Sequence, residues 1–165
     1  MVRTWIVLVA LLSVTGGCKK KRHRDRFAQF GSDGVVELPL LKLRLDLRTT
    51  REMISGGLWD GDGMGLSGAD VGAMRIEVAK TVQSFEDARD QARTLRARNL
   101  QAAELPDGWS LVYDLGSSTG VSYVVQVRRD LGGKTYLCST LATDPHQANV
   151  VAEACRTLRP ARSDR

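Results

Sequence analysis

Residues 109–138 of this 165-residue chain read WSLVYDLGSSTGVSYVVQVRRDLGGKTYLC, and this stretch decides the fold. Apolar and polar residues alternate through it, and glycine-rich turns interrupt it at 116–120 and 131–133. A period of two with short connections is typical of antiparallel strands. The stretch therefore predicts a meander of three antiparallel strands. One face of its first strand would carry Trp109, Leu111, Tyr113 and Leu115.

Two further strand segments precede the meander. Within 35–48, leucines alternate with polar residues from 41 to 47, as in a sheet with one wet face. Pro39 cannot donate to a strand ladder, so this strand begins after it or lies along an edge. Residues 74–78 repeat the alternation. Between the two, residues 55–72 hold seven glycines and three aspartates, which predicts a mobile glycine-rich loop.

Two segments have helical periodicity. The first begins with Ser84 as N-cap and Asp87 at the capping-box position, followed by an apolar stripe. The second begins at Asp144, which is followed by proline at the first helical position, and it ends before Pro160. Its apolar stripe includes Cys155, which is therefore expected to face the core.

The predicted element order is β-β-α-β-β-β-α. Such an order gives an α+β fold, with an antiparallel sheet and two helices packed on it in two layers. The length suits one domain, over residues 35–160, and residues 161–165 are expected to form a disordered C-terminus.

The N-terminus has the features of an export signal. Arg3 precedes an uncharged, mainly apolar run at 4–15, and small residues lead directly to Cys18. A membrane-spanning helix needs about 20 apolar residues, and this run is shorter. Residues 1–17 are therefore predicted to be a signal peptide. An uncleaved anchor and a buried N-terminal helix stay open as alternatives.

The segment Val14-Thr15-Gly16-Gly17-Cys18 resembles the lipobox of bacterial lipoproteins. It departs from the family pattern at Thr15, where leucine is preferred. The resemblance implies a diacylglycerol on the Cys18 sulfur, cleavage before this residue and acylation of the new amino terminus, by palmitate for example. It implies a cell-envelope protein anchored in the bilayer, facing the periplasm or the exterior. Lys19 replaces the acidic residue that retains many lipoproteins on the inner membrane, which favours the outer membrane.

The excess positive charge lies in a tether formed by residues 18–34. The chain has a formal net charge of +5, and residues 19–26 contain six basic residues and one acidic residue. Residues 27–165 hold 17 basic and 18 acidic residues, so the body has no basic character that would favour nucleic acid. The tether is either a solvated flexible spacer or a segment attracted to anionic head groups.

Cys138 and Cys155 are the remaining cysteines. An even number of cysteines in an exported protein predicts a disulfide, and two separate buried thiols are the alternative. His23 and His146 offer no metal-ligand spacing beside them, so no metal site is expected there.

The body resembles, in its element order, the small α+β sandwiches of the PsbP and Mog1 type. The resemblance covers residues 35–158 and includes the segment Pro106-Asp107-Gly108-Trp109 that leads into a strand. It implies a fold and no functional residues.

One motif suggests a serine nucleophile. Residues 116–120 match G-x-S-x-G, with Ser118 as the nucleophile and His146 as the downstream base. A nucleophile elbow requires a strand, a sharp turn and a helix, whereas a strand is expected after this turn. The context therefore argues against a hydrolase.

A second motif suggests calcium. The segment from Asp60 begins like an EF-hand loop, with Asp62 at its third position, but Met64 and Val71 occupy positions that need oxygen ligands. An irregular site that uses Asp60, Asp62 and Asp70 stays open. The apolar Trp59 and Met64 form either a binding edge or a contact with the body. Trp109, Tyr113 and Tyr123 fit core positions better than a ligand cage.

These features predict a lipid-anchored envelope protein without enzymatic activity, whose body binds another envelope protein or serves as an accessory module. No cofactor motif is present. A small-ligand or calcium-binding module that uses residues 55–72 is the alternative, and a serine hydrolase is the third candidate.

Overall fold

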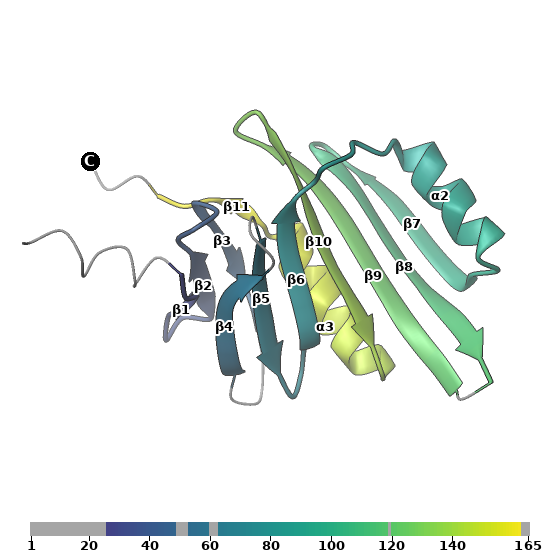
Figure 1. The fold of residues 1–165 in the computed structure, drawn as a ribbon, viewed down its shortest axis with the longest axis horizontal. Coiled ribbons are helices and arrows are strands. Elements are labelled where there is room, and N and C mark those ends of the chain that lie inside the picture. The colour runs from purple at the N-terminus through teal and green to yellow at the C-terminus, as the bar shows by residue number, and fades with distance from the viewer. Residues whose placement is uncertain (1–25, 49–52, 60–62, 119, 163–165) are drawn as a thin grey trace, which may run out of the picture.

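The structure, a computed structural model, describes residues 26–48, 53–59, 63–118 and 120–162. The predicted signal peptide at 1–17, the lipidation site Cys18 and most of the tether lie outside this part. Eleven strands and two helices lie within it (Figure 1). The strands are β1 Gln29–Phe30, β2 Val35–Leu38, β3 Leu43–Asp46, β4 Met53–Trp59, β5 Gly63–Gly68, β6 Gly72–Val78, β7 Arg98–Leu105, β8 Gly108–Ser117, β9 Gly120–Leu131, β10 Lys134–Ala142 and β11 Arg159–Pro160, and the helices are α2 Phe85–Thr94 and α3 Pro145–Arg156.

The predicted meander is confirmed as the centre of a seven-stranded antiparallel sheet with the order β4-β5-β6-β10-β9-β8-β7. Val125 lies opposite Val112 of β8, and Val127 lies opposite Cys138 of β10. The sheet also contains β7, which the sequence pattern did not predict, because its side chains are mostly exposed and do not alternate.

The two helices pack on opposite faces of this sheet. Trp109, Leu111 and Tyr113 form one core with α2. On the other face, Val112 and Val125 join a larger core with α3 and the leucines of β2 and β3. Figure 1 shows α3 behind the central strands. The α+β class is therefore confirmed, whereas the expected arrangement in two layers is wrong.

Side-chain caps fix both helix starts as predicted. The Asp87 amide donates to Ser84 Oγ at 3.1 Å, and the Gln147 amide donates to Asp144 Oδ1 at 2.9 Å. Satisfying an amide in the first turn stabilises a helix by about 1 kcal/mol. Helix α2 ends with Leu95 as its C-cap, and the chain then leads into β7.

Residues 35–48 form a hairpin rather than the single strand expected. Pro39 lies in the turn that separates β2 from β3, and the backbone reverses with a positive φ of 54° at Lys42. The buried residues on both strands still face one core, which explains why the alternation suggested one continuous strand. β1, β2, β3 and β11 form a second, four-stranded sheet.

An ion pair joins the chain end to this small sheet. Arg159 Nη2 of β11 lies 2.6 Å from Asp46 Oδ1 of β3. The hydrogen bond from Arg159 holds the pKa of Asp46 below its ordinary value. The carboxylate therefore keeps its charge, and its bond to Arg159 of β11, to a lower pH than an isolated aspartate would.

Residues 55–72 also differ from expectation, because most of the predicted loop is strand. β4 and β5 form a hairpin at the edge of the large sheet, with residues 60–62 at its tip outside the described part. Met64 and Leu66 are fully buried, so Met64 packs into the body instead of forming a binding edge. At Gly56, a Cβ would lie 2.6 Å from Ala28 Cβ and 2.7 Å from Leu66 Cδ2. The glycine therefore serves close packing here.

The predicted disulfide joins Cys138 of β10 to Cys155 of α3, with 5.7 Å between their Cα atoms. Both residues are fully buried. Beside the disulfide, at the C-terminal end of α3, Arg129 binds Asp107 with two contacts of 2.8 Å and donates to the Arg156 carbonyl. The disulfide and Arg129 hold α3 against the sheet.

Replacing both cysteines with alanine (C138A/C155A) is expected to lower the free energy of unfolding by about 3 kcal/mol, because the bridge closes a loop of 17 residues. Urea denaturation of the oxidised protein measures this difference. Cys18→Ser is the control and leaves the unfolding midpoint unchanged, and an equal midpoint for all three proteins would contradict the prediction.

Gly56→Ala is expected to destabilise the protein by about 1–3 kcal/mol, because a methyl group there overlaps Ala28 and Leu66. Gly57→Ala is the matched control, since its Cβ would have its nearest neighbour at 3.6 Å, an ordinary contact. Thermal unfolding followed by circular dichroism compares the two variants. Equal melting temperatures would contradict the close packing of β1 on β4.

Candidate functional site

One face of the seven-stranded sheet is only partly covered. Helix α2 packs against β7 and β8, and the same face of β9, β10, β6, β5 and β4 has no helix in front of it (Figure 1). Paired residues of neighbouring strands share a face of a sheet. We call this surface the open face. The pairing of β4, β5, β6, β10 and β9, together with the residues that line two hollows on the sheet, places on it Gly57, Gly65, Ser67, Ala73, Arg75, Val124, Gln126, Ser139 and Leu141.

The open face is hollow over β4, β5 and β6 because the strands supply very small side chains there. Gly57 lies opposite Gly65, and Ser67 lies opposite Ala73. The ring of Phe27 bounds this hollow, with Cδ1 3.6 Å from the position of a Gly57 Cβ. The volume is about 340 Å³. This is within the range of sites for small ligands, about 300–1,000 Å³.

A second hollow of about 340 Å³ continues the first across β6, β10 and β9. Ala73 and Met74 line both, so the two form one groove across the strands. Leu141 forms part of its lining and is 64% exposed, which is unusual for a leucine near the middle of a sheet. We call the combined surface the groove.

The polar groups of the groove are neutral or paired. Gln126 and Ser139 supply an amide and a hydroxyl. Arg75 Nη2 lies 2.7 Å from Glu77 Oε1, so the cation has a carboxylate partner on the same strand. No group of three or more His, Cys, Asp and Glu side chains able to hold a metal occurs in the described residues. The groove can therefore bind an apolar or extended ligand, whereas acid–base groups for catalysis are not gathered in it.

Beyond the groove, α2 closes the open face. The Gln83 carbonyl accepts from Trp109 Nε1 at 3.2 Å and from Arg128 Nη1 at 2.8 Å. Trp109 and Tyr113 are buried core residues, as predicted, and burial raises the pKa of the Tyr113 hydroxyl. Tyr123 packs partly buried on the opposite face.

Ser118 lies at the tip of the hairpin between β8 and β9 and is exposed. A strand follows it, so the strand–turn–strand context expected from the sequence is confirmed. His146 lies in the first turn of α3, where its Nε2 is 3.6 Å from Asp70 Oδ1. The carboxylate of Asp70 is buried. Sequence reasoning missed this pair, because residues 76 positions apart share no motif.

The calcium hypothesis for Asp60, Asp62 and Asp70 stays a prediction. Asp60 and Asp62 lie outside the described residues, and Asp70 is buried in the turn after β5, where its Oδ1 lies 3.6 Å from His146 Nε2.

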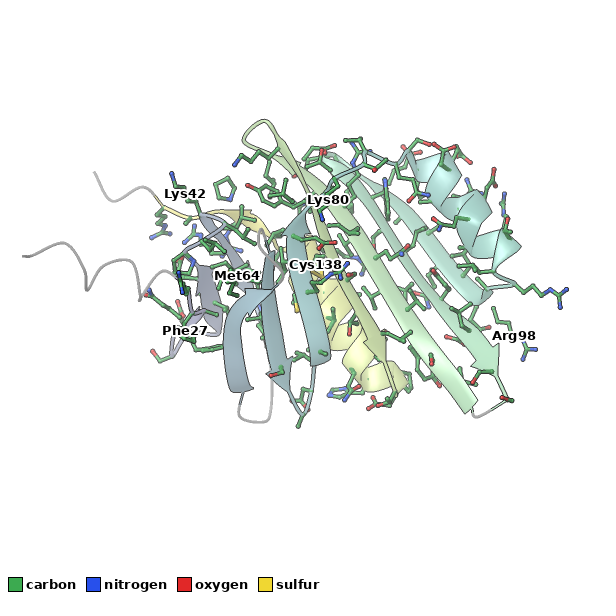
Figure 2. The ribbon with its side chains drawn as sticks, viewed as in Figure 1. Phe27, Lys42, Met64, Lys80, Arg98 and Cys138 are labelled. Atoms are coloured by element: carbon green, nitrogen blue, oxygen red, sulfur yellow. A yellow bond between two sulfur atoms is a disulfide. The ribbon has the colours of Figure 1, made fainter. Side chains whose placement is uncertain are left out.

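The described chain begins beside the groove. Figure 2 shows Phe27 and Arg98 at opposite ends of the molecule. Phe27 bridges to Gly57, and the Ala28 amide donates to the Gly56 carbonyl at 3.2 Å. No helix in the described ranges combines the length and hydropathy needed to cross a bilayer.

The comparisons with known proteins give no assignment. No model of a protein family matches the sequence, and no curated protein matches it. The candidate function therefore rests on the lipobox resemblance, the tether and the groove.

Proposed function

We propose that this protein is a bacterial envelope lipoprotein, anchored through acylated Cys18, that acts without catalysis by binding another envelope protein. The lipobox-like segment before Cys18 supports the anchor. Two or three acyl chains hold a protein at a bilayer essentially permanently, because each buried methylene contributes about 0.8 kcal/mol. The outer membrane is the favoured location, because Lys19 follows Cys18 in place of the acidic residue that retains many lipoproteins on the inner membrane.

The groove is the observation that supports a binding role. A soluble domain normally covers the apolar face of a sheet, and here Leu141, which is 64% exposed, lines a part of the sheet that no helix covers. The glycines of β4 and β5 carry no side chains of their own, so a ligand in the hollow beside Phe27 can approach the backbone of the sheet.

The ligand that fits this groove best is an extended, mainly apolar segment of a protein. The groove crosses several strands, and its only charged lining side chain, among the described residues, is Arg75 in its pair with Glu77. A neutral lining with a few hydrogen-bonding groups discriminates against charged ligands, because burying an uncompensated charge is unfavourable.

A small apolar molecule is the second candidate ligand. The residues that line this hollow belong to the segment 55–72, apart from Phe27, Ala73 and Met74, and its volume suits one such molecule. In this case the hollow alone is occupied, and the lining over β9 and β10 stays free.

The anchor predicts a specific mass. Intact-mass and peptide spectrometry of the protein purified from bacterial membranes should show a new N-terminus at Cys18 with diacylglycerol and an added acyl chain. Cys18→Ser should abolish the modification and release the protein from membranes in detergent-free extracts. A wild-type protein without acyl mass, or a Cys18→Ser protein that partitions wholly into membranes, would refute the anchor.

The binding role predicts a contact at Gln126. A photoreactive amino acid in place of Gln126 should crosslink in cells to a specific envelope protein, because this side chain lines the groove. Gln101 on β7 is the matched control, since it is exposed outside the groove and should give no such product. Ser139→Arg fills the groove and should remove the product at Gln126.

The outcomes separate the two ligands. A partner captured from Gln126 and lost in Ser139→Arg supports the protein ligand. An apolar molecule that co-purifies, is released by solvent extraction and is lost in Ser67→Trp supports the second candidate. Identical crosslinks from Gln126 and Gln101, with no extracted molecule, would refute a binding role for the groove.

A further inference from the structure

A row of polar side chains crosses the outer face of the four-stranded sheet. The leucines of β2 and β3 face the core, so the residues that alternate with them face outward. The strand pairing places the outward residues opposite one another in the order Gln29, Glu37, Arg44 and Arg159. Figure 1 shows the strands of this sheet at one end of the molecule. Two arginines therefore lie side by side in the row.

The guanidinium groups of these two arginines are bound differently. Arg159 Nη2 lies 2.6 Å from Asp46 Oδ1, and Arg159 Nη1 donates to the Thr157 carbonyl at 3.0 Å. Arg44 Nε is buried and has no hydrogen-bond partner within the described part of the chain. A buried donor without an acceptor is unfavourable, and native structures contain few of them. The fork of Arg44 is therefore available to an acceptor that comes from outside the chain.

The charged groups around Arg44 favour an anion as this acceptor. The hydrogen bond from Arg159 lowers the pKa of Asp46, and the charges of Arg44 and Arg48 lower it further. Three guanidinium groups thus act on one carboxylate, which is already bound to Arg159. Glu37 lies opposite Arg44 on β2 and is the second carboxylate of this face.

This part of the domain is positive as a whole. The segments 26–48 and 159–162, which contain the four-stranded sheet, carry six basic and three acidic side chains. The described residues from 53 to 158 carry ten basic and eleven acidic side chains. Glu153 of α3 borders the positive part, in a hollow that it shares with Asp46 and Arg48.

The chemistry of arginine selects the kind of anion. A guanidinium presents several N–H donors in one plane, and this fork matches the oxygens of a phosphate group. A phosphate monoester carries about two negative charges at neutral pH. It is therefore attracted to three arginines even with Asp46 and Glu37 nearby.

We propose that the outer face of the four-stranded sheet binds a phosphate group, held by the Arg44 guanidinium with Arg159 and Arg48 beside it. The group belongs either to a lipid head group or to a soluble phosphate ester, and both present the same oxygens to Arg44. The four-stranded sheet packs on the face of the large sheet that carries α3, opposite the groove. The phosphate site is therefore separate from the groove and adds a second binding surface to the proposed function.

The test titrates inorganic phosphate into the chain from residue 18 onward with Cys18→Ser, which contains every described residue and carries no lipid. NMR follows the Arg44 Nε–H signal and the backbone amides of β3 and β11 at constant ionic strength. Phosphate should shift these signals until they saturate. Sodium chloride at the same ionic strength should give no saturating shift.

Three variants and a control test the role of Arg44. Arg44→Gln should weaken phosphate binding roughly tenfold or more, because it removes the charged fork, and Arg44→Lys should weaken it to a smaller extent. Glu37→Gln should strengthen binding severalfold, since the carboxylate opposite Arg44 repels the ligand. Arg98→Gln removes one positive charge at the end of the molecule opposite Lys42 (Figure 2) and should bind like the parent protein.

Circular dichroism verifies that each variant is folded, and Arg44→Lys and Glu37→Gln decide the test if Arg44→Gln unfolds. No saturating shift with phosphate, or equal binding by Arg44→Gln and Arg98→Gln, would overturn the site. Weaker binding by Glu37→Gln would also overturn it and would make Arg44 a structural partner of Glu37.

A second pair of probes identifies the source of the phosphate. Binding to phosphatidic acid vesicles that is lost in Arg44→Gln, and is absent from pure phosphatidylcholine, supports the site and assigns a lipid head group. Saturable binding of glycerol phosphate without binding to these vesicles supports the site and assigns a soluble ester. Neither result depends on the acyl chains at Cys18 or on the ligand of the groove, so the phosphate site is tested separately from the proposed function.

Discussion

The pairing of β9 with β8 and β10 is the constraint on which the rest of the structure depends. Alternate residues of β9 point to opposite faces, so Val124 enters the core below α2 while Val125 enters the core below α3. A strand with apolar residues on both faces requires a cover on each. The helices supply these covers from opposite sides, and the disulfide and the Arg129 contacts fix one of them firmly.

The two faces are covered unequally, and the groove is the result. The face toward α3 also receives the four-stranded sheet, whose leucines fill the space that one helix cannot cover. The other face receives only the ten residues of α2, which reach β7 and β8. The strands beyond α2 carry the small residues Gly65, Ser67 and Ala73 on this face, which reduces the exposed apolar area. Because these side chains are so small, a hollow remains above them.

The sequence predicted those parts of the fold where local chemistry and tertiary packing agree. The meander, both helix caps and the disulfide are of this kind. Residues 35–48 and 55–72 were predicted wrongly, each for its own reason. In 35–48, the alternation of leucines does not reveal a reversal at Pro39. In 55–72, a glycine-rich composition does not distinguish a mobile loop from a close-packed strand. The groove could not be predicted, because it forms only when β4, β5 and β6 lie beside β10.

Gly56 and Gly57 connect the tether to the groove. Gly56 allows the segment at Ala28 to approach β4 closely, which places the Phe27 ring beside Gly57. The segment that follows the basic tether is therefore part of the wall of the groove. A single side chain, Phe27, therefore connects the segment that leads toward Cys18 with the hollow that the small residues of β4 and β5 leave open.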